Sequence, residues 1–70
     1  MNEGVQNKVQ AFRLKSGITQ EVLAEHVGVS RQTIIAIERG NYTPSILLAL
    51  KIARHFKTTV EDLFTLNRTR

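Results

Sequence analysis

The sequence predicts a small all-α domain of five helices, and three observations lead to that prediction. Apolar residues recur at spacings of three and four along most of the 70 residues, which is the period of a helix with one buried face. Several of these stretches are preceded by a serine or threonine that can cap a helix N-terminus. Glycines, which end helices in the left-handed conformation, follow the expected helix ends: Gly17, Gly28 and Gly40.

The composition predicts that residues 1–70 form one folded domain. Hydrophobic residues make up 41% of the chain and charged residues 23%, as in ordinary globular proteins. A core of this size supplies only about 3–5 kcal/mol of stability, so a second copy of the chain is expected to add to it. The absence of cysteine excludes a disulfide framework. No long apolar run opens the sequence, which predicts a cytoplasmic protein without a membrane span.

The charge distribution predicts a polyanionic partner. The formal net charge is +4, which favours nucleic acid or another polyanion. Glu38 is the only acidic residue between His26 and Val60. The basic residues of that interval are Arg31, Arg39, Lys51, Arg54 and Lys57.

The first helix is expected to begin at Val5, after a frayed terminus that reaches about Gly4. Val5, Val9 and Phe12 recur at helical spacing with polar residues between them. One stripe of this helix should therefore face the core, and Gly17 should end it.

The stretch from Thr19 to Gly40 predicts two short helices, over about residues 20–27 and 31–39, joined by a tight turn at Gly28. A glycine enters the left-handed conformation of such a turn without steric cost. Each helix is preceded by a residue whose hydroxyl can accept a hydrogen bond from its first turn: Thr19 and Ser30. The unit is a helix-turn-helix.

The fourth helix is expected over about residues 45–56, after the loop that contains Pro44. One inward stripe has apolar residues at helical intervals: Ile46, Ala49, Leu50, Ala53 and Phe56. Three further apolar residues exceed what one stripe needs, and such surplus often marks a partner surface: Leu47, Leu48 and Ile52.

Thr59 is expected to cap a short fifth helix in which Leu63 points to the core. Phe64 and Leu66 follow it. They either complete the core or join Leu47 or Leu48 in a dimer interface, and the sequence leaves both readings open. A basic tail is expected from residue 67 to 70.

The stretch from Gln20 to Arg39 resembles the twenty-residue motif of the Cro/cI-type, phage repressor-like (XRE) family of DNA-binding domains. The residues that carry the resemblance are a small residue, a turn glycine and two core aliphatics: Ala24, Gly28, Ile34 and Ile37. The wider run from Arg13 to Phe64 is similar too, and the domain is expected over about residues 9–63. The resemblance implies a five-helix repressor-like fold and sequence-specific binding of double-stranded DNA as a homodimer. It also implies a transcriptional regulator, and a repressor rather than an activator.

The helix over residues 31–39 is the expected recognition helix. Arginine and glutamine can bond to guanine and adenine in the major groove, and methyl groups can meet thymine. Related domains read bases from the same positions. The predicted readers of bases are Arg31, Gln32, Thr33 and Ala36. Ile35 is apolar on this helix without a clear role: it covers a groove beside the fourth helix, touches DNA or is exposed.

Phosphate contacts are expected from the start of the second helix and from the loop after the third. Gln20 occupies the position at which members of the family clamp a phosphate, and helix N-termini favour anions. The loop residues are polar and hydrogen-bonding: Arg39, Asn41, Tyr42 and Thr43. The resemblance also implies a buried ion pair between Arg13 and Glu38.

Two other functions remain open. The domain could be the antitoxin of a toxin-antitoxin pair, with a toxin as partner of its surplus apolar residues, or a protein-binding helical module without DNA contact. An enzyme is not expected, because the sequence has no paired carboxylates, Ser/His/Asp set or thiol. His26 and His55 lie on different helices without partners, so neither a metal site nor a cofactor is expected.

Overall fold

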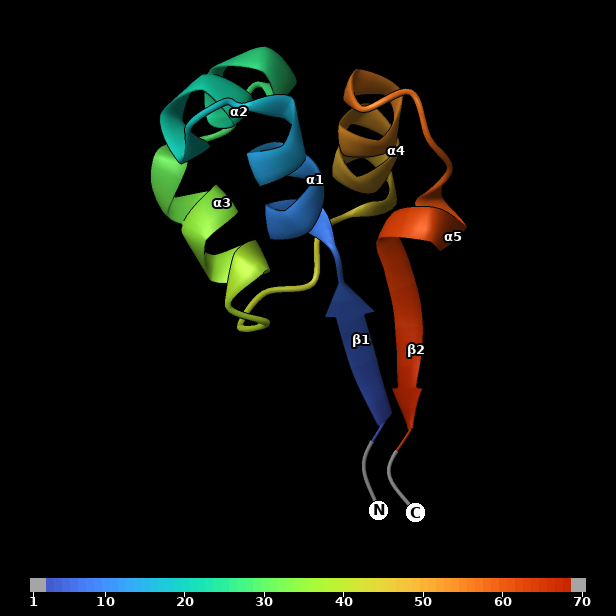
Figure 1. Cartoon of the computed structure of the whole chain (residues 1–70). Helices are drawn as coiled ribbons and strands as arrows, with labels where there is room; N and C mark the ends of the chain where they lie inside the picture. The colour runs from blue at the N-terminus through green and yellow to red at the C-terminus, as the bar shows by residue number, and fades with distance from the viewer. Residues whose placement is uncertain (1–2, 69–70) are drawn as a thin grey trace.

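A computed structural model describes residues 3–68 of the chain (Figure 1). Five helices form a body from which a two-stranded ribbon extends (Figure 1). Met1, Asn2, Thr69 and Arg70, which belong to the expected frayed terminus and basic tail, lie outside the described residues. The elements are β1 (Glu3–Asn7), α1 (Val9–Ser16), α2 (Gln20–Val27), α3 (Arg31–Glu38), α4 (Ile46–His55), α5 (Val60–Leu63) and β2 (Phe64–Arg68).

Hydroxyl groups cap the four helices that follow α1. Thr19 Oγ1 accepts from the Val22 backbone N–H at 3.1 Å, and the same contact recurs one helix later, where Ser30 Oγ accepts from Thr33 at 3.2 Å. Ser45 and Thr59 repeat it at α4 and α5. Each such cap stabilises its helix by about 1 kcal/mol, so the helix starts follow from local sequence.

The core lies where α2, α3, α4 and α5 meet the start of α1. Its fully buried side chains come from all five helices, so each helix contributes to one common core. Phe12, Ile18, Val29, Phe56, Val60 and Phe64 pack against it. The buried residues are Val9, Leu23, Ala24, Val27, Ile34, Ile37, Leu48, Ile52, Ala53 and Leu63.

The all-α prediction is only partly right, because the chain also forms a two-stranded antiparallel sheet. The first helix does not begin at Val5: residues 3–7 are strand β1, and Val5 pairs with Leu66 of β2. Asn67 belongs to β2 and not to a tail. The spacing between Val5 and Val9 fits either structure locally. The pairing partner lies about 60 residues away along the chain, so local periodicity could not show it.

The inward face of α4 also differs from the prediction. Leu48, Ala49, Ile52 and Ala53 are buried, whereas Ile46 and Leu50 are exposed. Both sets of residues have helical spacing, so periodicity alone cannot say which set faces the rest of the molecule. Contact with α2 selects the first set.

Two residues predicted for a dimer interface therefore face their own core. Leu48 is buried, and Phe64 is half-buried and packs against the core cluster. Leu47 and Leu66, the other two residues of that prediction, are exposed.

Candidate nucleic-acid interface

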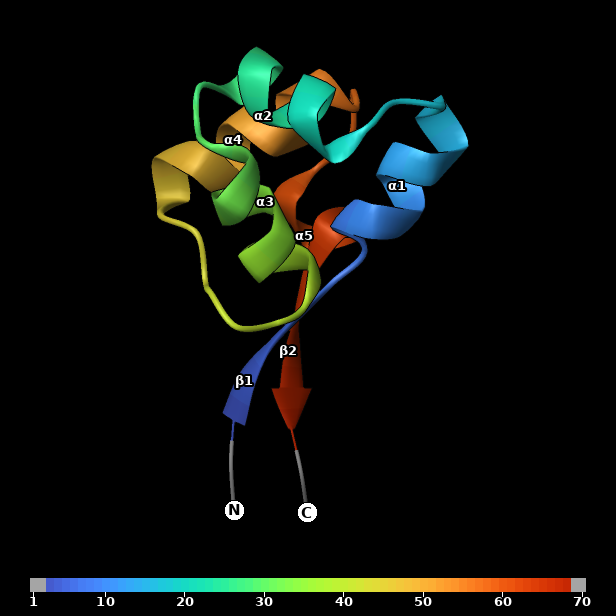
Figure 2. The ribbon, with the colours of Figure 1, turned by 90° about the vertical axis from the view of Figure 1, so that its left-hand side faces the viewer.

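Helices α2 and α3 form the predicted helix-turn-helix. Gly28 has a φ of 78°, in the left-handed region, and the Val29 N–H donates to the Ala24 carbonyl at 3.0 Å. The turn is therefore closed by backbone bonds that a glycine permits. Figure 2 shows α3 on the face of the helical body that is turned to the viewer, and no other helix or strand lies in front of it.

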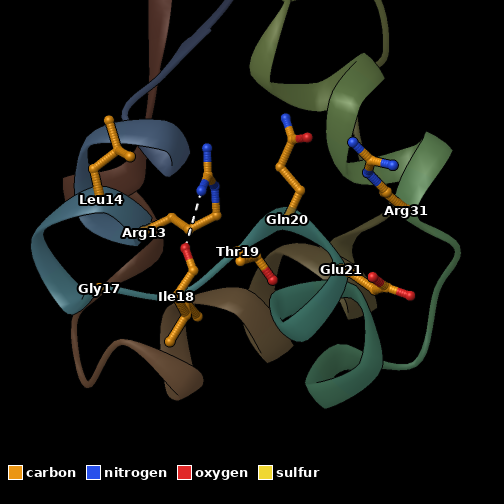
Figure 3. Close-up of a pocket in the computed structure, with 8 residues that line it drawn as sticks. All are labelled: Arg13, Leu14, Gly17, Ile18, Thr19, Gln20, Glu21 and Arg31. Atoms are coloured by element: carbon orange, nitrogen blue, oxygen red, sulfur yellow. Dashed lines mark hydrogen bonds between the residues drawn. The ribbon is translucent and has the colours of Figure 1, made fainter.

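The Arg13–Glu38 ion pair is present and joins α1 to the end of α3. Arg13 Nε donates to Glu38 Oε2 at 2.7 Å and Nη2 donates to Oε1 at 3.2 Å. The two side chains are only 9% and 4% exposed. Arg13 Nη1 also donates to the Ile18 carbonyl at 2.9 Å (Figure 3). This bidentate geometry fixes α1 against the helix-turn-helix.

Gln20 belongs to the same network. Its Nε2 donates to Glu38 Oε1 at 3.0 Å, so one buried carboxylate receives hydrogen bonds from both α1 and α2. Because the side-chain amide nitrogen is committed to Glu38, a phosphate contact from Gln20 would come from its backbone N–H at the start of α2. The predicted role of Gln20 as a phosphate clamp stays a prediction, and the structure adds a positioning role.

Two hollows flank Gln20 and Arg31 on the outer side of the motif. One, of about 600 Å³, lies between α1, α2 and α3, and Figure 3 shows the Gln20 side chain between those of Arg13 and Arg31. The other, of about 360 Å³, is lined by Gln10, Gln20, Arg31, Ile35, Glu38 and Arg39. Gln20 and Arg31 line both hollows.

The four side chains predicted to read bases differ in their exposure and in whether they already make a hydrogen bond. Arg31 and Gln32 are exposed, whereas Thr33 and Ala36 are half-buried. Thr33 Oγ1 lies 3.1 Å from Ser30 Oγ and takes part in the cap of α3. Arg31 and Gln32 are therefore the side chains with free hydrogen-bonding groups at the start of α3.

Ile35 lies on the outward side of α3. It is half-buried and lines the smaller hollow together with residues of α1, α2 and α3, and none of α4. Of the three roles that the sequence left open, this lining favours an outward position of Ile35 over one beside α4. An apolar side chain here can meet the apolar edge of a partner, such as a thymine methyl.

The loop after α3 holds the other predicted phosphate contacts. Arg39, Asn41, Tyr42 and Thr43 are all exposed. The Asn41 N–H donates to the Ala36 carbonyl at 2.9 Å, and that of Gly40 donates to Ile37 at 2.9 Å. The loop therefore begins tightly bound to the end of α3, which places its polar side chains beside that helix.

Sequence reasoning missed Asn7, which ties the ribbon to α3. Its Nδ2 donates to the Ile37 carbonyl at 2.8 Å, and its Oδ1 accepts from the Val9 N–H at 3.1 Å. An asparagine side chain commonly accepts a hydrogen bond from the backbone two residues on, so the bond to Val9 is a local one. Nothing local, however, signals a partner 30 residues away.

The sequence also gave the two histidines no partner, and the structure brings them together. The ring centroids of His26 at the end of α2 and His55 at the end of α4 lie 5.0 Å apart. Burial, and then the proximity of His26, lower the pKa of His55 from its ordinary value. Within residues 3–68, no group of three or more His, Cys, Asp or Glu side chains is placed to hold a metal ion.

The chain is similar to known proteins both in sequence and in structure. A family model described as Helix-turn-helix matches residues 9–63. The chain is 53% identical over 62 residues to the uncharacterised HTH-type transcriptional regulator YgzD of Bacillus subtilis, covering 89% of this chain and 94% of that protein. It is 53% identical over 60 residues to the HTH-type transcriptional regulator MJ0272 of Methanocaldococcus jannaschii, covering 86% and 91% of the two chains.

Two further matches are more distant. The cryptic phage CTXphi transcriptional repressor RstR of Vibrio cholerae is 25% identical over 63 residues, which cover 90% of this chain and 57% of RstR. The crystal structure of the restriction-modification controller protein C.AhdI from Aeromonas hydrophila superimposes with a TM-score of 0.73 and 27% identity, covering 79% of this chain and 83% of that one. None of the helices in residues 3–68 has the length and apolar character needed to cross a membrane.

Proposed function

The chain belongs to the helix-turn-helix family, and from that premise we propose that it is a transcriptional repressor that binds double-stranded DNA sequence-specifically as a homodimer. The family assignment supports DNA binding and a regulatory rather than a catalytic role. The similarity to RstR, which is named as a transcriptional repressor, favours repression over activation.

One observation carries the proposal: the start of α3 presents exposed hydrogen-bond donors and carries no carboxylate of its own, although the exposed Glu21 of α2 lines the same hollow as Arg31. Arg31 and Gln32 are exposed there. Glu38, the only acid between His26 and Val60, is buried and paired with Arg13. An acid-poor helix edge of this kind can enter the major groove and donate to the acceptor atoms of guanine or adenine.

A second copy completes the site. One recognition helix of 8 residues contacts few base pairs, whereas two copies related by a two-fold axis read half-sites about 34–36 Å apart. The operator should therefore be pseudo-palindromic. About 6–10 phosphate contacts per dimer would weaken binding by about 10³–10⁵ between 50 and 200 mM salt.

Selection of bound fragments from the host genome, followed by sequencing, tests this function. A shared pseudo-palindromic element in the selected fragments is expected. Fragments without a common element, or no binding at low salt, would argue against sequence-specific recognition.

Substitutions at the motif then separate base readout from positioning. Arg31→Ala should cost about 1–3 kcal/mol at one operator position and relax the base choice there. Gln20→Ala keeps the backbone N–H at the start of α2 but removes the hydrogen bond to Glu38, so it should weaken all sequences alike by loosening the position of α2 against α3. Equal losses on operator and unrelated DNA for both variants would contradict this division.

A further inference from the structure

A hollow of about 280 Å³ lies between the turn of the helix-turn-helix and the start of α4. Its lining comes from the end of α2, the turn, the start of α3, the loop after α3 and α4. In Figure 2 the turn, the loop and the start of α4 border the left side of the helical body. Arg13, Gln20 and Glu38, which hold the end of α3, line other hollows. The network around Glu38 is therefore separate from this one.

The floor of the hollow is apolar. Val27 and Leu48 are only 4% and 7% exposed, and Val29 beside them is half-buried. Leu47, which is 64% exposed, adds an apolar wall at the rim, and Gly28 completes the lining on the side of the turn. A cavity of about 150 Å³ already holds a benzene molecule. This hollow thus has room for a ring and one polar group.

The remaining lining residues carry groups that can donate hydrogen bonds. They are Thr33, Tyr42, Ser45 and Lys51. Tyr42 and Lys51 are exposed at the rim. Ser45 Oγ accepts from the Leu48 N–H at 3.1 Å in the cap of α4, which leaves the hydroxyl proton of Ser45 able to donate to a ligand. The rim of the hollow therefore offers donors to an acceptor group.

Lys51 gives the hollow its charge, because it is the only charged residue among the described residues that line it. Within residues 3–68 the one ion pair joins Arg13 to Glu38. The Lys51 ammonium is thus not paired with a carboxylate of that part of the chain, although Glu25 lines a neighbouring hollow together with it. An apolar floor with a cation and hydroxyl donors at its rim is complementary to a molecule that has an apolar body and one anionic group.

We propose that this hollow binds a small carboxylate with an apolar body, of about the size of benzoate, and that its binding opposes DNA binding. The apolar body lies against Val27 and Leu48, and the carboxylate accepts from Lys51 and Tyr42 at the rim. Inorganic phosphate is a poorer ligand, because a polar anion loses its hydration against an apolar floor without a hydrogen bond in return.

Two lining residues belong to the proposed DNA interface as well. Thr33 is a predicted reader of bases, and Tyr42 is a predicted phosphate contact. A carboxylate in the hollow covers both side chains and adds a negative charge where phosphates approach, so ligand and DNA compete. The ligand thereby acts as an inducer that releases the repressor from its operator. This competition rests on the proposed function, whereas binding of the carboxylate does not.

Titration of the isotope-labelled full chain with three small molecules, followed by NMR, tests the binding. Benzoate should give saturable shifts at millimolar concentration, as expected of a ligand with so few atoms, and they should concentrate at Val29, Thr33 and Leu48. Benzamide keeps the ring without the charge, and acetate keeps the charge without the ring. Each should bind at least about tenfold more weakly than benzoate. No saturable shift with benzoate, shifts elsewhere, or equal affinity for benzoate and either analogue would overturn the proposal.

Lys51→Met tests the cation, since it removes the charge and keeps a side chain of similar shape. Benzoate should bind this variant at least about tenfold more weakly than the wild type, and the affinity for benzamide should not change. Lys15→Met is the matched control, because Lys15 is likewise exposed on a helix and is not part of the lining. Its affinity for benzoate should equal that of the wild type. Undiminished benzoate binding by Lys51→Met, or equal losses in both variants, would contradict the proposed ligand class.

Operator binding in the presence of benzoate tests the competition. Sodium benzoate should weaken operator binding of the wild type at least about fivefold more than sodium chloride at the same concentration, a comparison that removes the effect of salt. In Lys51→Met the two salts should act alike. Because coupling is reciprocal, saturating operator should weaken benzoate binding by the same factor.

The two measurements separate this inference from the proposed function. Benzoate that binds in the hollow and leaves operator affinity unchanged would refute the role as an inducer, while DNA recognition would stand. A wild type that binds no DNA would reject the proposed function, and the NMR titration would still decide whether the hollow binds a carboxylate.

Discussion

Helices α3 and α4 both pack apolar side chains into the same core, and the end of α3 is held in addition by long-range side-chain hydrogen bonds. The end of α3 is fixed by hydrogen bonds: Glu38 receives donors from α1 and α2, and Asn7 of the ribbon donates to the Ile37 carbonyl. Helix α4 is fixed by apolar packing of Leu48, Ile52 and their neighbours. Hydrogen bonds are directional and apolar packing is not. The helix proposed to read bases is thus the one whose orientation is set by directional contacts.

Arg13→Ala should have the largest effect on stability, because it removes the cation that pairs with the buried Glu38 carboxylate. Leaving Glu38 buried without its cation should cost about 3–5 kcal/mol in the free energy of unfolding. Denaturant titration measures it. Arg31→Ala is the control, since Arg31 is exposed, and it should change stability by less than about 0.5 kcal/mol. Similar losses in both variants would show that the buried pair does not stabilise α3.

Leu48→Ala tests how much the apolar packing of α4 stabilises the fold. Truncating this buried side chain should cost about 2–5 kcal/mol, from lost transfer energy and from the cavity left behind. Leu14→Ala, at an exposed site on α1, should cost well under 1 kcal/mol in the same thermal or chemical unfolding experiment. A small loss for Leu48→Ala would mean that α4 packs by the stripe the sequence suggested.

Lys57→Gly should stabilise the chain, because it relieves backbone strain just after the end of α4. Lys57 has a φ of 57°, a left-handed conformation that costs a residue with a Cβ roughly 1 kcal/mol relative to glycine. The melting temperature should rise. Lys51→Gly, in the interior of α4, should lower stability by a similar amount. The same sign for both changes would contradict the strain at Lys57.

The smallest effect should come from the histidine contact between the motif and α4. The pKa of His55 is lowered below its ordinary value of 6.5 by burial and by His26, so the unfolded chain binds a proton more readily. The contribution of neutral His55 to the free energy of unfolding should therefore be fully present above about pH 6.5 and should be lost as the pH falls below it.

Unfolding free energies between about pH 5 and 8 measure this decline, because carboxylates titrate mainly below that range. His55→Gln should flatten the dependence. A variant that loses stability on acidification as the wild type does would place the effect elsewhere.

The sequence was enough to predict those features that depend only on residues close together in the chain. The caps at Thr19 and Ser30 and the left-handed Gly28 each involve residues within a few positions. The helix-turn-helix and its exposed residues Arg31 and Gln32 could therefore be predicted. The Arg13–Glu38 pair spans 25 positions and was accessible only through the family resemblance.

The sequence by itself thus determined which segments of the central motif are helical and that Arg31 and Gln32 are exposed at the start of its third helix. Only the tertiary structure decided that residues 3–7 form a strand with residues 64–68 and that Leu48 rather than Leu50 faces inward. It also decided that Gln20 and Asn7 hold the end of α3. The physical reason is that strand pairing, the choice between two stripes of equal periodicity and long-range hydrogen bonds depend on partners distant in sequence, which no local pattern contains.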